Sequence, residues 1–134
     1  MTVGLPASGK STWLARRGIV PLSSDLLRQL LLDDPTDVSQ QSAIFSALRW
    51  LLRLRLSLRR PVTYVDATNL DRKERRPYFR LAESFDCAVD AVFFDVPLKA
   101  CLERNARRKR RVQVEVMRRF AARLRPPTYA EGFR

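Results

Sequence analysis

The chain has 134 residues, of which 46% are hydrophobic and 30% charged, and it carries a formal net charge of +12 with a pI near 11.1. This length predicts one compact domain spanning residues 1–134, and the composition excludes a disordered or fibrous chain. Histidine is absent, which excludes a histidine base, a histidine metal ligand and a Ser-His-Asp triad.

Hydropathy and cysteine content indicate which classes of protein the sequence does not fit. No run approaches the roughly 18 apolar residues of a membrane-spanning helix, and no charged-then-apolar leader precedes the first motif, so we expect a cytoplasmic protein without membrane partners. Cys87 and Cys101 are too few for a disulfide framework or a zinc site, and both are expected to fill the core. The positive charge is typical of proteins that bind polyanions, although a compositional bias toward arginine predicts the same excess.

Short apolar runs alternate with longer amphipathic stretches, which is typical of a parallel sheet with helices on both faces. Strands are expected at residues 1–4, 19–22, 62–65 and 88–96. Helices are expected from about 11 to 18, 25 to about 32, 37 to about 58, 71 to 85, 97 toward 105, and about 114 to 124. The predicted fold class is therefore α/β, with a parallel sheet between two layers of helices.

Two of the expected helices have unusual sequence patterns. Leu52–Leu58 alternates Leu with Arg or Ser, the period of a half-buried strand, but Arg60 and Pro61 interrupt the chain before a better strand candidate, so the helix is favoured. Residues 71–85 resemble a charged surface helix.

Residues 4–11 match the phosphate-binding pattern G-x-x-x-x-G-K-[ST] in full, after an apolar run and before a helix-compatible one. Glycines let the loop curl so that its N–H groups face phosphate oxygens. Lys10 is expected at the β- and γ-phosphates, and the Ser11 hydroxyl at Mg²⁺. A chance glycine turn is the alternative. The cofactor-binding residues expected for ATP are Gly4, Pro6, Ala7, Ser8, Gly9, Lys10, Ser11 and Thr12.

Asp25 and Arg28 lie three residues apart at the start of a predicted helix, on one helix face. This helix start lies at the carboxyl edge of the sheet, where open α/β folds bind ligands. Asp25 there would accept a proton from an acceptor hydroxyl, and Arg28 would hold an acceptor phosphate. A helix-capping acid and a solvated arginine are the alternative.

Two further clusters carry polar chemistry. Asp66 and Thr68 follow an apolar strand at the same edge, which favours Asp66 as a magnesium ligand and Thr68 as a substrate contact, whereas Asn69 would cap the next turn. Arg104 and Arg108 share one helix face beside the basic segment 107–111, where arginines would offset the charge of a transferring phosphoryl group; a solvated basic run is the alternative.

The assembled residues resemble the 5′-hydroxyl polynucleotide kinase family, within the P-loop superfamily of AAA-type ATPases and zeta-toxin-like kinases. The resemblance is carried by the loop 4–12, by Ser24, Asp25 and Arg28, by 66–70, and by 94–97 with Arg104, Asn105 and Arg108. It implies that Lys10 and Ser11 bind ATP and magnesium, that Asp25 is the general base, and that Arg28 contacts the acceptor phosphate. Arg104 and Arg108 match the lid arginines of the family, and Thr68 matches a threonine near the acceptor phosphate.

The resemblance implies a P-loop NTPase fold with three α/β/α layers, a parallel sheet and an arginine-rich lid. It also implies an ATP-dependent kinase that phosphorylates the 5′-hydroxyl end of RNA or DNA. The lid is richer in arginine than is usual for that family, and Gln113 stands where a proline is common. Two alternatives stay open at this stage: a kinase of a small-molecule hydroxyl, because one fold serves many acceptors, and a non-catalytic ATP-binding module.

Overall fold

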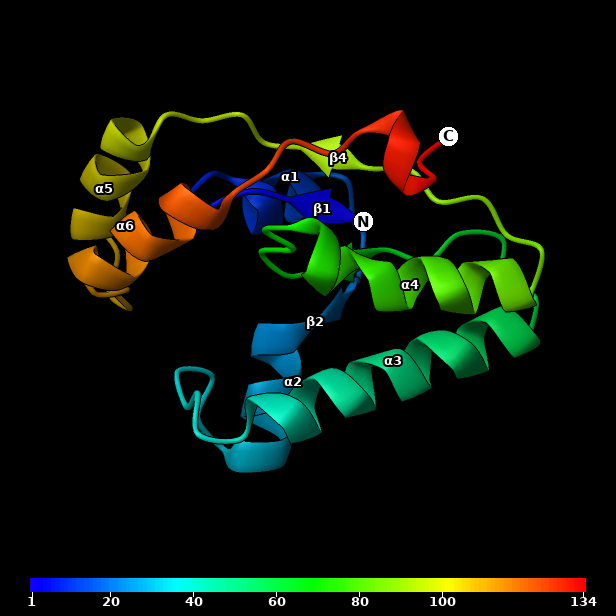
Figure 1. Cartoon of the computed structure of the whole chain (residues 1–134). Helices are drawn as coiled ribbons and strands as arrows, with labels where there is room; N and C mark the ends of the chain where they lie inside the picture. Colours follow the sequence, from blue (N-terminus) through cyan, green and yellow to red (C-terminus); the bar gives the residue numbers. More distant parts are fainter.

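The computed structural model describes residues 1–134, in which helices alternate with very short strands (Figure 1). The elements are β1 (Thr2–Val3), α1 (Lys10–Arg16), β2 (Leu22–Ser23), α2 (Ser24–Leu32), α3 (Gln41–Ser57), β3 (Val65–Asp66), α4 (Arg72–Ser84), β4 (Val92–Phe93), α5 (Leu98–Ala106), α6 (Val114–Arg123) and a 3₁₀ turn, η1 (Tyr129–Glu131). The α/β class is confirmed. No helix is long and apolar enough to cross a membrane.

The strands pair in parallel, as predicted. β1 pairs with β4, and β2 pairs with β3 so that Ser23 lies opposite Asp66. The Gly4 N–H donates to the Thr68 carbonyl at 3.1 Å, which places the end of β1 beside the end of β3. The strands thus form two two-stranded sheets, β1–β4 and β2–β3, with β1 beside β3, and the carboxyl ends of β1, β2 and β3 meet at one edge.

Helices pack on opposite sides of β3. Tyr64, just before the strand, contacts Trp13 of α1 with ring centroids 6.4 Å apart. The next residue, Val65, packs in a cluster with Leu48 of α3 and Tyr78 of α4. Because neighbouring residues of an extended chain point to opposite faces, α1 covers one face and the α3–α4 pair the other. Figure 1 shows α4 in front of β1 and α1 behind it.

The strands are shorter than the sequence predicts. The run 88–96 pairs only over Val92–Phe93, because the Val96 N–H bonds back to the Phe94 carbonyl at 2.9 Å and turns the chain out of the sheet. The runs 19–22 and 62–65 pair only at their last residues and beyond, and Val20 and Val62 are exposed.

The helix predicted from residue 37 begins four residues later. Asp34 and Asp37 accept hydrogen bonds from the N–H groups of Thr36 and Ser39, each at 2.8 Å, and these side chains stabilise turns in place of the first helical turn. The same helix continues to Ser57, which confirms the helical interpretation of residues 52–57.

The prediction that α4 is a surface helix is wrong for one of its faces, which is buried. Arg75, Tyr78 and Ala82 are buried, and the fully buried Arg75 guanidinium forms a bidentate pair with Glu131 at 2.8 and 2.7 Å. The C-terminal segment, which has no periodicity, is thereby held against α4. The prediction that both cysteines are core residues is half wrong, because Cys101 is buried whereas Cys87 is exposed.

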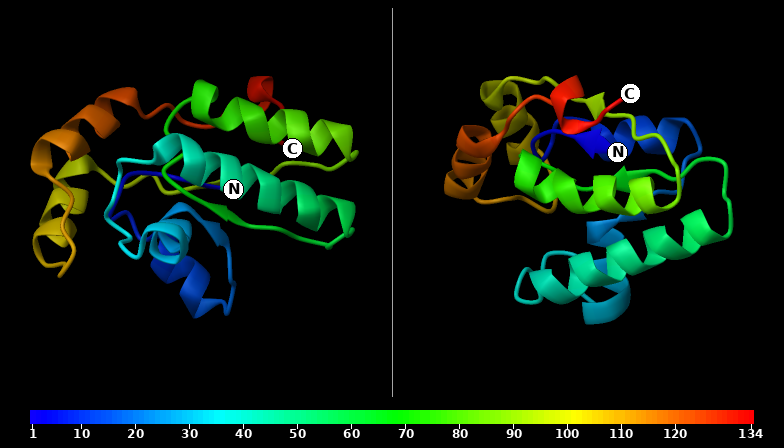
Figure 2. Two further views of the ribbon diagram at one scale, coloured as in Figure 1. Left: turned by 90° about the horizontal axis from the view of Figure 1, so that it is seen from below. Right: turned by 45° about the vertical axis from the view of Figure 1, so that its right-hand side comes forward.

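Helices α5 and α6 pack against each other and against the phosphate loop. Cys101 of α5 and Met117 of α6 form a buried cluster with Leu5 and Leu70, the residues that follow β1 and β3. Both views of Figure 2 show the two helices together at one end of the molecule. The basic segment 107–111 joins them, so this packing sets where its arginines lie.

Candidate functional site

The loop between β1 and α1 has the conformation of a tight backbone cradle. Ala7 and Gly9 have positive φ angles of 61° and 98°, and Pro6 and Ala7 form its outer turn. A Cβ at Gly4 would approach the Ser8 Oγ to 2.9 Å and the Phe94 Cβ to 3.0 Å, so this position requires glycine. The predicted nucleotide-binding residues thus form one continuous turn, with Thr12 exposed on α1.

Lys10 lies inside this loop. Its buried ammonium donates to the carbonyl oxygens of Gly4 and Leu5 at 2.9 and 2.7 Å. Burial lowers the pKa of Lys10 to about 8, and the Asp66 carboxylate opposes this shift. The charged ammonium is hydrogen-bonded only to these two backbone carbonyls, which phosphate oxygens could replace.

The lowered pKa of Lys10 predicts a pH dependence of ATP binding. Phosphate oxygens favour the charged ammonium, so binding requires a proton on Lys10 that the free protein loses as the pH rises through about 8. The dissociation constant for MgATP is therefore expected to be nearly constant from pH 6.5 to 7.5 and about tenfold weaker at pH 9 than at pH 7. Isothermal titration calorimetry over this range measures it, and an unchanged affinity at pH 9 would contradict the assignment of Lys10.

Ser11 and Asp66 form a pair that suits a hard cation. The Ser11 hydroxyl donates to Asp66 Oδ2 at 3.0 Å, and Asp66 Oδ1 accepts from the Thr2 hydroxyl at 2.8 Å. Asp66 is buried and held by β1, while Ser11 is exposed at the start of α1. A hydroxyl and a carboxylate so placed are the oxygen ligands that Mg²⁺ takes beside a phosphate loop, so the residues present fit this ion.

The acceptor-side pair lies together as the spacing predicts. Arg28 Nη1 donates to Asp25 Oδ1 at 2.8 Å, and Arg28 Nη2 donates to the Gln41 side-chain oxygen at 2.6 Å. The Arg28 side chain is only 8% exposed, and its Nε is buried without a partner. The guanidinium is therefore fixed between α2 and α3, with one donor still unsatisfied.

The segment α5–α6 contacts both sides of the site. Arg104 Nη1 donates to the Ser8 carbonyl of the phosphate loop at 3.4 Å, and Arg110 Nη2 donates to Asp25 Oδ2 at 2.6 Å. Arg108, which lies between Arg104 and Arg110 in the sequence, has a half-buried side chain. Arg104 and Arg108 are predicted here from their spacing, whereas nothing in the sequence distinguishes Arg110 from the other members of the basic segment 107–111.

The segment after β3 supports the loop. The Thr68 carbonyl accepts the Gly4 N–H, and its half-buried side chain makes no hydrogen bond within the chain. The prediction that Asn69 caps the next turn is wrong: its amide is buried and donates to the Thr2 carbonyl at 2.8 Å, while Asp71 caps α4. Asn69 thus ties β3 to β1 at the edge that carries Asp66.

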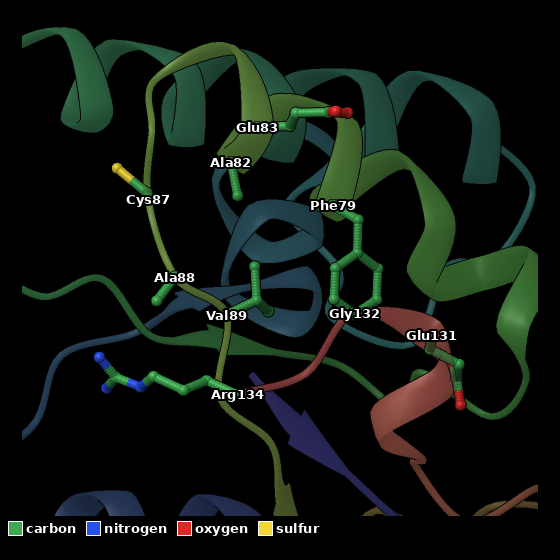
Figure 3. Close-up of a pocket in the computed structure, with 9 residues that line it drawn as sticks. All are labelled: Phe79, Ala82, Glu83, Cys87, Ala88, Val89, Glu131, Gly132 and Arg134. Carbon is green, nitrogen blue, oxygen red and sulfur yellow. The ribbon is translucent and has the colours of Figure 1, made fainter.

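Of two hollows on the surface, the larger lies away from this site. A cavity of about 360 Å³ lies between α4 and the C-terminal residues (Figure 3). It is lined by Phe79, Ala82, Glu83, Cys87, Ala88, Val89, Glu131, Gly132 and Arg134. A second hollow of about 220 Å³ includes Ser11, Ser23 and Asp66 in its lining and lies beside the candidate metal pair. The chemistry of the side chains therefore locates the site better than cavity size does.

A family model described as AAA domain matches residues 1–127. The chain belongs to this AAA domain family. The family is of the P-loop NTPase type, so membership supports a nucleotide-binding fold and a kinase-like function in general. The loop at residues 4–11 is the part expected to bind phosphate. No curated protein matches the chain. Nucleotide binding by this AAA domain is thus shown at the level of its family, and the acceptor is not.

Proposed function

We propose that this AAA domain is an ATP-dependent kinase that transfers the γ-phosphoryl group of ATP to the 5′-hydroxyl end of RNA or DNA. The observation that carries the proposal is that one segment, α5–α6, contacts the phosphate loop through Arg104 and the candidate base Asp25 through Arg110. The donor side and the acceptor side therefore belong to a single site. The net charge of +12 favours a polyanionic acceptor.

In the proposed reaction the acceptor hydroxyl oxygen attacks the γ-phosphorus, and the bond from that phosphorus to the bridging oxygen of ADP breaks. Asp25 takes the proton of the hydroxyl, and Arg28 holds the neighbouring phosphate of the acceptor, with Thr68 beside it. The products are ADP and a 5′-phosphorylated end.

The remaining residues stabilise charge on the transferring group. Lys10, Arg104 and Arg108 place positive charge around the phosphoryl oxygens, where a loose transition state spreads its charge. Ser11 and Asp66 would hold Mg²⁺, which supplies charge neutralisation between the β- and γ-phosphates when bound. Arg104 and Arg108 in this proposal are the functional arginines of the arginine-rich lid.

The test is transfer of labelled γ-phosphate from ATP with Mg²⁺ to a short 5′-hydroxyl oligonucleotide, beside the same oligonucleotide carrying a 5′-phosphate. We expect label on the 5′-hydroxyl oligonucleotide alone, and none with Lys10→Ala. A polynucleotide acceptor held through several phosphates should also lose affinity steeply as salt rises, unlike a small neutral acceptor. ATP binding without label on the oligonucleotide would favour a small-molecule acceptor or a non-catalytic module.

A further inference from the structure

Both carboxylate oxygens of Asp25 are occupied by arginines, and the two arginines differ in how firmly they are held. Arg28 is 8% exposed and is also bound to Gln41. Arg110 is 37% exposed, and its one hydrogen-bond partner is Asp25, itself 49% exposed. Arg110 is therefore the partner that an incoming molecule can displace, while Arg28 stays in place.

Of the two Asp25 oxygens, Oδ2 is the one bound by the exposed arginine, so an acceptor hydroxyl that uses Asp25 as its base reaches it beside Arg110 or in place of Arg110. A neutral alcohol that displaced Arg110 would offer its guanidinium no anion in exchange, beside the equally positive Arg28. An acceptor with a phosphate next to its hydroxyl would supply a new anion, so that Arg110 exchanges one charge-assisted hydrogen bond for another. The contact between Arg110 and Asp25 thus disfavours neutral acceptors and favours acceptors that carry a phosphate.

We propose that Arg110 is a specificity-determining residue, which passes from Asp25 to the phosphate adjacent to the acceptor hydroxyl when the acceptor enters. This inference rests on the proposed function and deepens it, since it defines the acceptor class as a hydroxyl with a neighbouring phosphate. It also distinguishes Arg110 from its neighbour Arg111, whose exposed side chain donates only to the backbone carbonyl of Arg108.

The experiment compares two 5′-hydroxyl trinucleotides. One has an ordinary phosphodiester as its first linkage, and the other has a neutral methylphosphonate there. Values of kcat/KM for both are measured with the wild-type protein, with Arg110→Ala, and with Arg111→Ala as the matched control from the same segment. Circular dichroism checks that each variant is folded.

We expect the wild-type protein and Arg111→Ala to favour the phosphodiester by the same factor, and Arg110→Ala to lower that preference by about tenfold or more, the value of a hydrogen bond between charged groups. An Arg110→Ala protein that keeps the wild-type preference within about twofold, or that gains or loses rate equally on both trinucleotides, would overturn the inference.

A protein that phosphorylates neither trinucleotide would refute the proposed function and still leave Arg110 testable. Fluorescence anisotropy then measures binding of the same two trinucleotides, labelled at the 3′ end. The same loss of preference with Arg110→Ala, and not with Arg111→Ala, supports the role of Arg110 in recognition, whereas equal preference in all three proteins overturns it.

Discussion

Asp25→Asn is expected to retain the affinity for MgATP and to lower the rate of phosphoryl transfer by about 100-fold or more, within the range that a positioned general base contributes. The amide can still accept the hydrogen bond that Arg28 donates at 2.8 Å, but it cannot take a proton from the acceptor hydroxyl. Steady-state transfer to a 5′-hydroxyl oligonucleotide measures the rate, and calorimetry measures ATP binding.

The matched control is Asp33→Asn. Asp33 is exposed, ends the same helix α2 and has a φ of 59°, a conformation that asparagine tolerates well. The Asp33→Asn substitution should leave both the rate of phosphoryl transfer and the affinity for MgATP unchanged. Equal turnover by the wild-type protein and Asp25→Asn would refute the assignment of the base, and a drop of the same size with Asp33→Asn would point to a general effect of charge.

Glu131→Gln is expected to lower the free energy of unfolding by about 3–5 kcal/mol, because it leaves the charge of the buried Arg75 without its anion. The Arg75 guanidinium also donates to the carbonyls of Asn69 and Arg125, each at 3.0 Å. These hydrogen bonds link the residues after β3 to the C-terminal segment. Urea denaturation followed by circular dichroism measures the change.

The control for this prediction is an ion pair on the surface. Arg134 and Asp90 approach to 2.7 Å but are both exposed, and Asp90→Asn should cost less than about 1 kcal/mol. Replacing both buried partners, as in Arg75→Met with Glu131→Leu, should cost less than Glu131→Gln alone, because no uncompensated charge remains. A Glu131→Gln protein as stable as Asp90→Asn would show that the buried pair does not hold the segment.

The order of helices and strands could be predicted well, and their lengths less well. Apolar periodicity located α3 and α6 because each turns an apolar stripe toward the core, with Leu48 buried in α3 and Met117 buried in α6. It overestimated the strands, because exposed residues such as Val20 and Val62 have β-propensity without a neighbour to pair with. It also missed the buried Arg75, since an arginine in a charged helix carries no sign of a partner elsewhere in the chain.

By itself the sequence determined the phosphate-loop motif and the placement of Asp25 and Arg28 on one helix face, because these depend on residues close together in the chain. The alternation of apolar runs with amphipathic stretches likewise indicated the α/β class. Only the tertiary structure decided that Arg110 binds Asp25 across 85 positions and that Arg75 binds Glu131 across 56. Such pairs depend on how α4, α5 and α6 pack. The sequence does not distinguish one arginine of a basic run from its neighbours. Only the packing of the helices shows which of them lies beside a carboxylate.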